Sequence, residues 1–155
     1  MTSKSKISAQ ATVRIPFQDA DPAGVVWHGN YFRYFETARL ALLEEIDYGY
    51  RQMANSGYIW PIVDTRVKFI LPVKFDETIR IEATLMEWEY RLKIAYKVFG
   101  ENGECTTKAH TIQVAVDANT GELCMGSPSD LMKRIEAFLG GGSTFSTAGS
   151  GQRDG

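Results

Sequence analysis

Residues 19–43 read DADPAGVVWHGNYFRYFETARLALL, and this stretch decides the fold. Its first part is rich in turn-forming residues, and from about Asn30 apolar residues recur at helical spacing: Tyr31, Tyr34, Phe35, Ala38 and Leu42. We expect the helix to end near Tyr48 and Gly49, because glycine readily adopts the left-handed conformation of a C-cap. This helix carries more apolar residues than a surface helix needs, which indicates that another layer wraps around it.

Both flanks of this stretch alternate between apolar and polar residues, as half-buried strands do. The upstream run predicts a strand over residues 11–17 with one apolar face, made of Ala11, Val13, Ile15 and Phe17. Downstream, four runs separated by turn-forming segments lie at about residues 63–71, 79–85, 92–98 and 112–116. Short turns between consecutive strands favour an antiparallel sheet. A last helix is predicted from Ser127 as N-cap and Pro128 as first helical residue to Gly140.

The predicted fold is therefore α+β, with a long central helix packed against a largely antiparallel sheet. The chain has 155 residues, 44% hydrophobic and 23% charged, which suits one globular domain. We expect that domain over residues 8–140, followed by a disordered Gly/Ser-rich tail over residues 141–155.

Charge and composition exclude several classes of protein. The net charge is −2 and no basic stripe stands out along the chain, so nucleic acid is not an expected partner. No apolar run reaches the length of a membrane span, and the N-terminus lacks the apolar core of a signal peptide, so we expect a cytoplasmic protein that does not enter membranes. Cys105 and Cys124 are expected to be free thiols, and the two histidines have no metal-type spacing, so neither a metal site nor a cofactor is predicted.

The turn before the long helix is where chemistry is expected. A helix N-terminus exposes unpaired backbone N–H groups, which suit a developing oxyanion. Asp21 lies seven residues before His28, across a loop that could fold back over the helix start. A carboxylate and an oxyanion-binding amide would then flank one carbonyl, as acyl transfer requires. The alternative is that Asp21 is only a cap or turn residue.

The string from Asp19 to Arg33 resembles the signature of the 4-hydroxybenzoyl-CoA thioesterase family, which has the hot-dog fold. Similar residues continue downstream, so the resemblance spans about residues 11–116: Trp60-Pro61-Ile62-Val63, Phe75-Asp76-Glu77, Ile81-Glu82 and Glu87-Trp88. It implies a long helix wrapped by an antiparallel sheet of five to six strands. It also implies a homodimer with active sites at the dimer interface, which often pairs into a tetramer, and chemistry without a metal.

The resemblance assigns roles to two residues of the turn. The second Asp of the family motif is the catalytic carboxylate, here Asp21, and the amide seven residues on, here the backbone N–H of His28, polarises the thioester carbonyl. Asp21 then acts either as a nucleophile on the carbonyl or as a general base on water. The side chain of His28 either takes part in the reaction or fills the helix start.

Three residues that follow are candidates for substrate binding. Gly29 would let a substrate approach the backbone closely. Asn30 would cap the helix, which we favour, or position Asp21. Tyr31 belongs to the apolar stripe, and we favour a core role over a place in a substrate cage.

Three more candidates lie further along the chain. Glu36 would contact the far end of the acyl group, or form an ion pair with Arg39 or Arg33 at helical spacing, which we favour slightly. Arg91 and Lys93 resemble a thinner version of the family's basic cluster for CoA phosphates, although a solvated surface charge is the simpler interpretation of each.

The leading hypothesis is an acyl-CoA thioesterase that hydrolyses an aromatic or short-to-medium acyl-CoA. The alternatives are an acyl-carrier-protein thioesterase, a hot-dog dehydratase, or a non-catalytic acyl-CoA-binding protein. Turnover of acyl-CoA and of acyl-carrier protein separates the first two.

Overall fold

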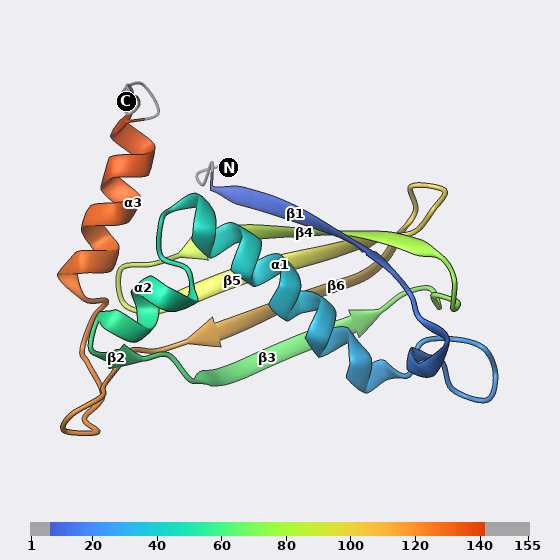
Figure 1. The fold of residues 1–155 in the computed structure, drawn as a ribbon, viewed down its shortest axis with the longest axis horizontal. Helices are drawn as coiled ribbons and strands as arrows, with labels where there is room; N and C mark the ends of the chain where they lie inside the picture. The colour runs from blue at the N-terminus through green and yellow to red at the C-terminus, as the bar shows by residue number, and fades with distance from the viewer. Residues whose placement is uncertain (1–6, 142–155) are drawn as a thin grey trace.

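The computed structural model describes residues 7–141 (Figure 1). Its main feature is an antiparallel five-stranded sheet in the order β1-β4-β5-β6-β3. The strands are β1 (Ser8–Arg14), β3 (Ile62–Phe69), β4 (Thr78–Glu87), β5 (Leu92–Phe99) and β6 (Cys105–Gln113). A small second sheet pairs β2 (Tyr58–Ile59) with β7 (Val116–Asp117).

Strands β4 and β5 supply one side of the hydrophobic core, because apolar residues alternate with polar ones along each strand. Every second residue of each strand faces inward and is fully buried, namely Ile79, Ile81, Ala83 and Leu85 on β4 and Leu92, Ile94, Tyr96 and Val98 on β5. The opposite face of these two strands carries mainly polar and charged residues, among them Arg80, Glu82, Lys93 and Lys97.

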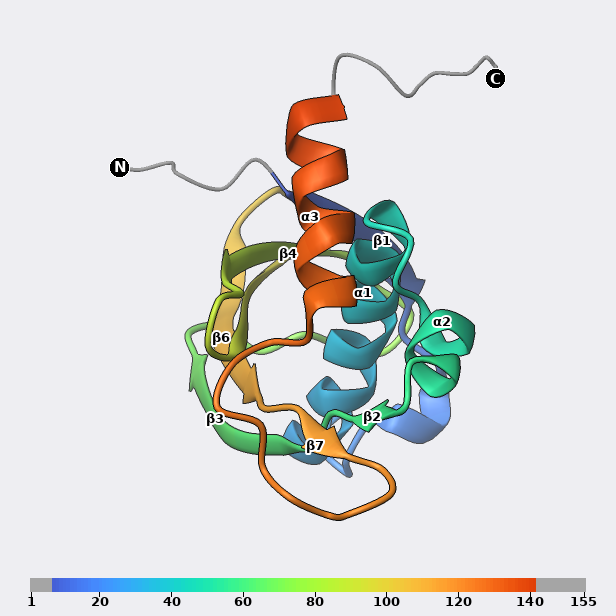
Figure 2. The ribbon, with the colours of Figure 1, turned by 90° about the vertical axis from the view of Figure 1, so that its left-hand side faces the viewer.

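Helix α1 (Tyr31–Glu45) supplies the other half of the core. Its predicted stripe is buried, and the helix packs mainly against β1 and β4. Figure 2 shows the sheet curving around α1. The predicted hot-dog arrangement, a long helix wrapped by an antiparallel sheet, is therefore confirmed.

Several predicted boundaries were wrong. The first strand ends at Arg14, and Phe17 begins a short 3-10 helix, η1 (Phe17–Asp19), so its ring is 75% exposed instead of facing the core. Helix α1 ends at Glu45 and not near Gly49, because Asp47 takes the left-handed conformation with φ 59°. Gly49 instead precedes α2 (Tyr50–Asn55), a helix that we did not predict.

The last predicted strand was also displaced. Strand β6 (Cys105–Gln113) begins earlier than predicted. It contains the buried polar residues Thr106, Thr107 and Thr111, which an apolar alternation does not reveal. Helix α3 (Ser129–Gly141) starts one residue later than the predicted first helical residue, Pro128. Ser127 does not cap it, since its hydroxyl donates to the carbonyl of Trp88. The predicted tail lies outside the described residues, apart from residue 141.

Candidate active site at the start of helix α1

The loop that carries Asp21 closes on itself. Bridge pairing joins Ala20 to Val26, and the N–H of Asp21 donates to the carbonyl of Val25 over 2.8 Å. Gly24 has a φ of 85°, which a residue with a side chain rarely adopts, so glycine is needed to turn the loop. Oδ1 of Asp21 accepts hydrogen bonds from the N–H groups of Ala23 at 2.9 Å and Val25 at 3.4 Å. These contacts fix the direction of the carboxylate.

The preceding carboxylate, Asp19, anchors the loop to the helix. It is buried, and its Oδ2 accepts a 2.6 Å hydrogen bond from the hydroxyl of Tyr34 and lies 2.6 Å from the guanidinium of Arg33. Burial and this hydrogen bond raise the pKa of Tyr34, so the phenol stays a donor. The side chain of Asn30 donates to the Asp19 carbonyl at 2.8 Å. Asn30 therefore occupies the predicted N-cap position of α1, but its side chain makes no capping hydrogen bond and holds the loop instead.

A single turn of 3-10 helix, η2 (His28–Asn30), leads into α1. Within residues 7–141, no protein acceptor takes the backbone N–H of His28. This is the orphan donor expected at a helix N-terminus.

Asp21 and His28 line the same cleft, which has a volume of about 310 Å³. Its other walls are mostly apolar and come from three segments: Val26, Tyr31, Phe69, Ile70, Leu71 and Pro72. Tyr31 is buried, with its ring centroid 5.1 Å from that of Phe69, and burial raises the pKa of its phenol. Tyr31 thus serves both the core and the cleft. Residues 69–72 also line the cleft, which their sequence does not reveal, because this apolar run predicts only a strand end and a turn.

This geometry agrees with the comparison with known proteins. Residues 15–136 match the family model of the thioesterase-like superfamily. The chain belongs to this superfamily. The match confirms the predicted resemblance and the predicted class of enzyme, a thioester hydrolase.

The alignments with three relatives extend over most of this thioesterase-like chain. A putative acyl-CoA thioesterase of Bacillus subtilis is 24% identical over 106 residues, 68% of this chain and 77% of that protein. The solved 4-hydroxybenzoyl-CoA thioesterase of Pseudomonas is 26% identical with a TM-score of 0.72, over 82% of this chain and 98% of that one. A DHNA-CoA thioesterase of Staphylococcus aureus, 21% identical with a TM-score of 0.77 over 91% and 97%, shares the fold.

In this thioesterase-like domain, Gly29 leaves room for a neighbouring side chain. A Cβ at Gly29 would lie only 2.2 Å from an indole carbon of Trp27. Trp27, whose side chain is half-exposed, lies against Gly29 in this structure, and the close approach of a substrate to Gly29 stays a prediction.

The favoured ion pair of Glu36 is confirmed. Its Oε2 pairs with Arg39, and its Oε1 accepts a 3.0 Å hydrogen bond from the hydroxyl of Tyr50. Arg39 is buried and interacts with the hydroxyl of Tyr96, which is 2.9 Å from that of Thr111. Burial alone would lower the pKa of Arg39, but Tyr96 and Glu36 raise it, so the guanidinium stays charged. Glu36 is therefore a partly exposed carboxylate that Arg39 and Tyr50 hold in place.

Arg91 and Lys93 lie far from Asp21 within one chain. Both follow the β4–β5 turn, whereas the Asp21 loop contacts the segment before β4 through the pairing of Val25 with Lys74. The length of β4 separates the two regions by about 30 Å, at about 3.3 Å per residue. One chain therefore does not bring them together, which sequence spacing alone could not reveal.

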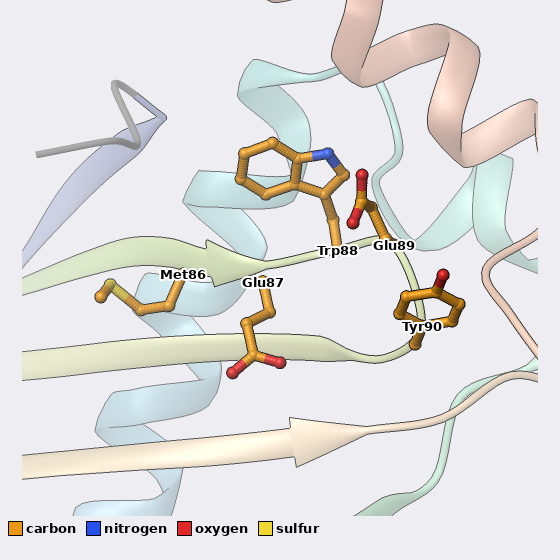
Figure 3. A pocket seen from close by; sticks show the side chains of 5 residues that line it. All are labelled: Met86, Glu87, Trp88, Glu89 and Tyr90. Atoms are coloured by element: carbon orange, nitrogen blue, oxygen red, sulfur yellow. The ribbon is translucent and has the colours of Figure 1, made fainter.

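A second hollow of about 290 Å³ surrounds that turn and is lined by Met86, Glu87, Trp88, Glu89 and Tyr90 (Figure 3). Trp88 points towards the helices, and Glu87 points to the opposite side of the strand. Arg91 forms an ion pair with Glu87 at 2.9 Å, and both side chains are nearly half-exposed.

Within residues 7–141, no group of three or more His, Cys, Asp or Glu side chains is arranged to hold a metal ion. None of the helices in this range is both long and apolar enough to cross a membrane. Cys105 and Cys124 are free thiols in the described structure.

Proposed function

We propose that this protein hydrolyses an acyl-CoA thioester, with Asp21 as the catalytic carboxylate and the backbone N–H of His28 as the oxyanion donor. The observation that carries the proposal is that both groups line one cleft at the start of α1. The thioester carbonyl oxygen would accept from His28, and the carbonyl carbon would face Asp21. A preorganised donor of this kind typically contributes about 10²–10³ in rate.

The contacts of Asp21 suit either role in this reaction. Its Oδ1 is held by two backbone amides, and within the described residues nothing bonds to Oδ2. As a nucleophile, Oδ2 would form an acyl anhydride with loss of the CoA thiolate, and water would then release the acid. As a general base, it would take a proton from the water that attacks the carbonyl.

An aromatic or short-to-medium acyl group suits the cleft, because aromatic and aliphatic side chains line it beside Asp21 and His28. Tyr31 and Phe69 meet edge to face at 75° and would pack on a ring or a short chain. The names of the two solved relatives, which both act on aroyl-CoA thioesters, support the aromatic option.

We also propose that the enzyme works as a homodimer formed through β3, and that two dimers can pair into a tetramer. In the described sheet, β3 is an edge strand, and several half-exposed apolar residues lie on it or directly after it: Ile62, Val63, Phe69, Ile70 and Leu71. An edge of this kind readily pairs with another strand. Antiparallel pairing of two β3 strands would reverse the partner's sheet, which would bring the partner subunit's Arg91 and Lys93 towards the Asp21 end and to the phosphates of CoA.

The test is steady-state hydrolysis of a panel of short, medium, long and aromatic acyl-CoA thioesters by wild type and Asp21→Asn. We expect turnover of at least one thioester, and a loss of two or more orders of magnitude in kcat for the variant. The matched control is Asp76→Asn, which alters an exposed ion pair with Arg14 and should leave kcat unchanged. A fully active Asp21→Asn would disprove the mechanism. Single turnover in H₂¹⁸O, with label found in Asp21, would identify the nucleophilic route.

A further inference from the structure

Phe69, the last residue of β3, lies between two other rings that line the cleft. Its ring centroid is 5.1 Å from that of Tyr31 at 75° and 6.4 Å from that of His28 at 73°, so both contacts are edge to face. Phe69 also lies directly opposite Thr107 of β6, and the side chain of Thr107 hydrogen-bonds to Tyr31. Tyr31 and Phe69 therefore join α1 to β3 and β6 at one level of the sheet, and we call these two residues the ring wall.

Smaller side chains follow the ring wall on the same face of the sheet. Val67 lies two residues before Phe69, so it faces the same way, and it pairs with Ala109, which packs partly against the core. The next pair on this face is Thr65 with Thr111. Val67 is partly exposed and Thr65 is exposed, so solvent reaches this face in the single chain. The four residues from Phe69 to Thr65 span about 13 Å, at about 3.3 Å per residue.

Polar groups end this stretch of small side chains. The hydroxyl of Thr111 is 2.9 Å from that of Tyr96, and Tyr96 also interacts with the buried guanidinium of Arg39. An apolar chain that reached these groups would remove water from them without offering a hydrogen bond, which is unfavourable. The space behind the ring wall therefore suits a straight acyl chain of medium length.

We propose that Phe69 determines the acyl specificity, because its ring closes the cleft to straight chains of medium length. An acyl group that ends at the ring wall, either aromatic or short, then places its thioester between Asp21 and the N–H of His28. This inference rests on the proposed thioesterase function and narrows the range of acyl groups named there. A planar acyl ring packs on the two rings of the wall, whereas a straight chain has to displace Phe69 from both of its contacts.

The position of Phe69 is compatible with the proposed dimer. Pairing through the free edge of β3 uses main-chain N–H and C=O groups and leaves each side chain on the face that it already occupies. Phe69 therefore stays on the α1 side of the sheet, next to Tyr31, in the single chain and in the paired one.

The test measures kcat/KM for butanoyl-CoA, benzoyl-CoA and decanoyl-CoA with Phe69→Trp, wild type, Phe69→Leu and Phe69→Ala. We expect the ratio of decanoyl to benzoyl turnover to rise in that order, by about tenfold or more between wild type and Phe69→Ala. This estimate is cautious, because one methylene in an apolar pocket is typically worth about 10–200-fold. Butanoyl-CoA ends before the ring wall, so its turnover should change little across the series.

The matched control is Phe75→Ala, which removes a half-exposed ring that contacts Phe17 and does not line the cleft. It should keep the wild-type ratio. Thermal melts and light scattering show which variants keep the fold and the mass of wild type. If Phe69→Ala misfolds, Phe69→Leu and Phe69→Trp still decide the matter, because they should shift the ratio in opposite directions.

The contrary results are distinct from one another. A ratio that stays constant across the Phe69 series would overturn the inference, and so would a wild type that prefers decanoyl-CoA to both other thioesters. Equal losses on all three thioesters would leave Phe69 with a structural role only and would also overturn it. If wild type hydrolyses no thioester of the wider acyl panel either, the proposed function itself fails.

Discussion

The hydroxyl of Tyr34 donates a 2.6 Å hydrogen bond to Oδ2 of Asp19, and both residues are buried. The bond joins the first full turn of α1 to the loop that carries Asp21. Asp19 and Asp21 are thus two carboxylates of one motif with separate roles, since Asp19 anchors the loop and Asp21 faces the cleft.

Tyr34→Phe should lower the free energy of unfolding by about 1–2 kcal/mol, because it leaves a buried carboxylate oxygen with one partner fewer. The loss stays modest because Arg33 still pairs with Asp19. Urea denaturation measures the change. Tyr90→Phe, at a side chain that is 76% exposed, is the control and should leave stability unchanged. If the two variants are equally stable, the Tyr34–Asp19 bond does not anchor the loop.

Gly29→Ala should destabilise the start of α1, because its Cβ would overlap the indole of Trp27. We expect a loss of about 1–3 kcal/mol, typical of overpacking, together with a lower kcat. Adding Gly29→Ala to a Trp27→Ala background should then cost far less than in wild type. Thermal melts of wild type, the two single variants and the double variant give the coupling free energy between the two positions. Strictly additive losses would refute the steric explanation.

Arg39→Ala should cost about 3 kcal/mol, because it removes a buried guanidinium that links α1 to Tyr96. Glu36→Gln should cost less than about 1 kcal/mol, since the side chain of Glu36 is 43% exposed and solvent screens the pair. Denaturant titration of both variants tests this asymmetry. Equal losses would mean that the exposed carboxylate matters as much for stability as the buried cation.

Val63→Lys should convert a β3-mediated dimer into monomers, because it would bury a charge between the two paired strands. Val63 is 57% exposed in the single chain, so its own fold should not suffer. Light scattering after gel filtration reports the mass, and activity should fall with it. Met125→Lys, at a side chain that is 91% exposed, is the control. A Val63→Lys protein that stays dimeric would place the interface elsewhere.

The elements with strong periodicity were predictable, and those that rely on polar burial were not. Tyr31 to Leu42 form a helix because their stripe repeats at helical spacing, and the inward residues of β4 and β5 alternate cleanly. The start of β6 was missed because Thr106 and Thr107 look like loop residues until a sheet supplies partners for them. Asp47, and not glycine, ends the α1 region in the left-handed conformation, which a rule based on glycine does not anticipate.

The sequence by itself determined the central helix, the antiparallel sheet, the family and the loop that presents Asp21, because these depend on local periodicity and on a contiguous motif. Only the tertiary structure decided which distant residues meet. It brought Phe69 to the cleft and opposite Thr107, and it separated Arg91 and Lys93 from Asp21. The physical reason is strand register: which residues lie opposite each other depends on how the whole sheet closes around α1.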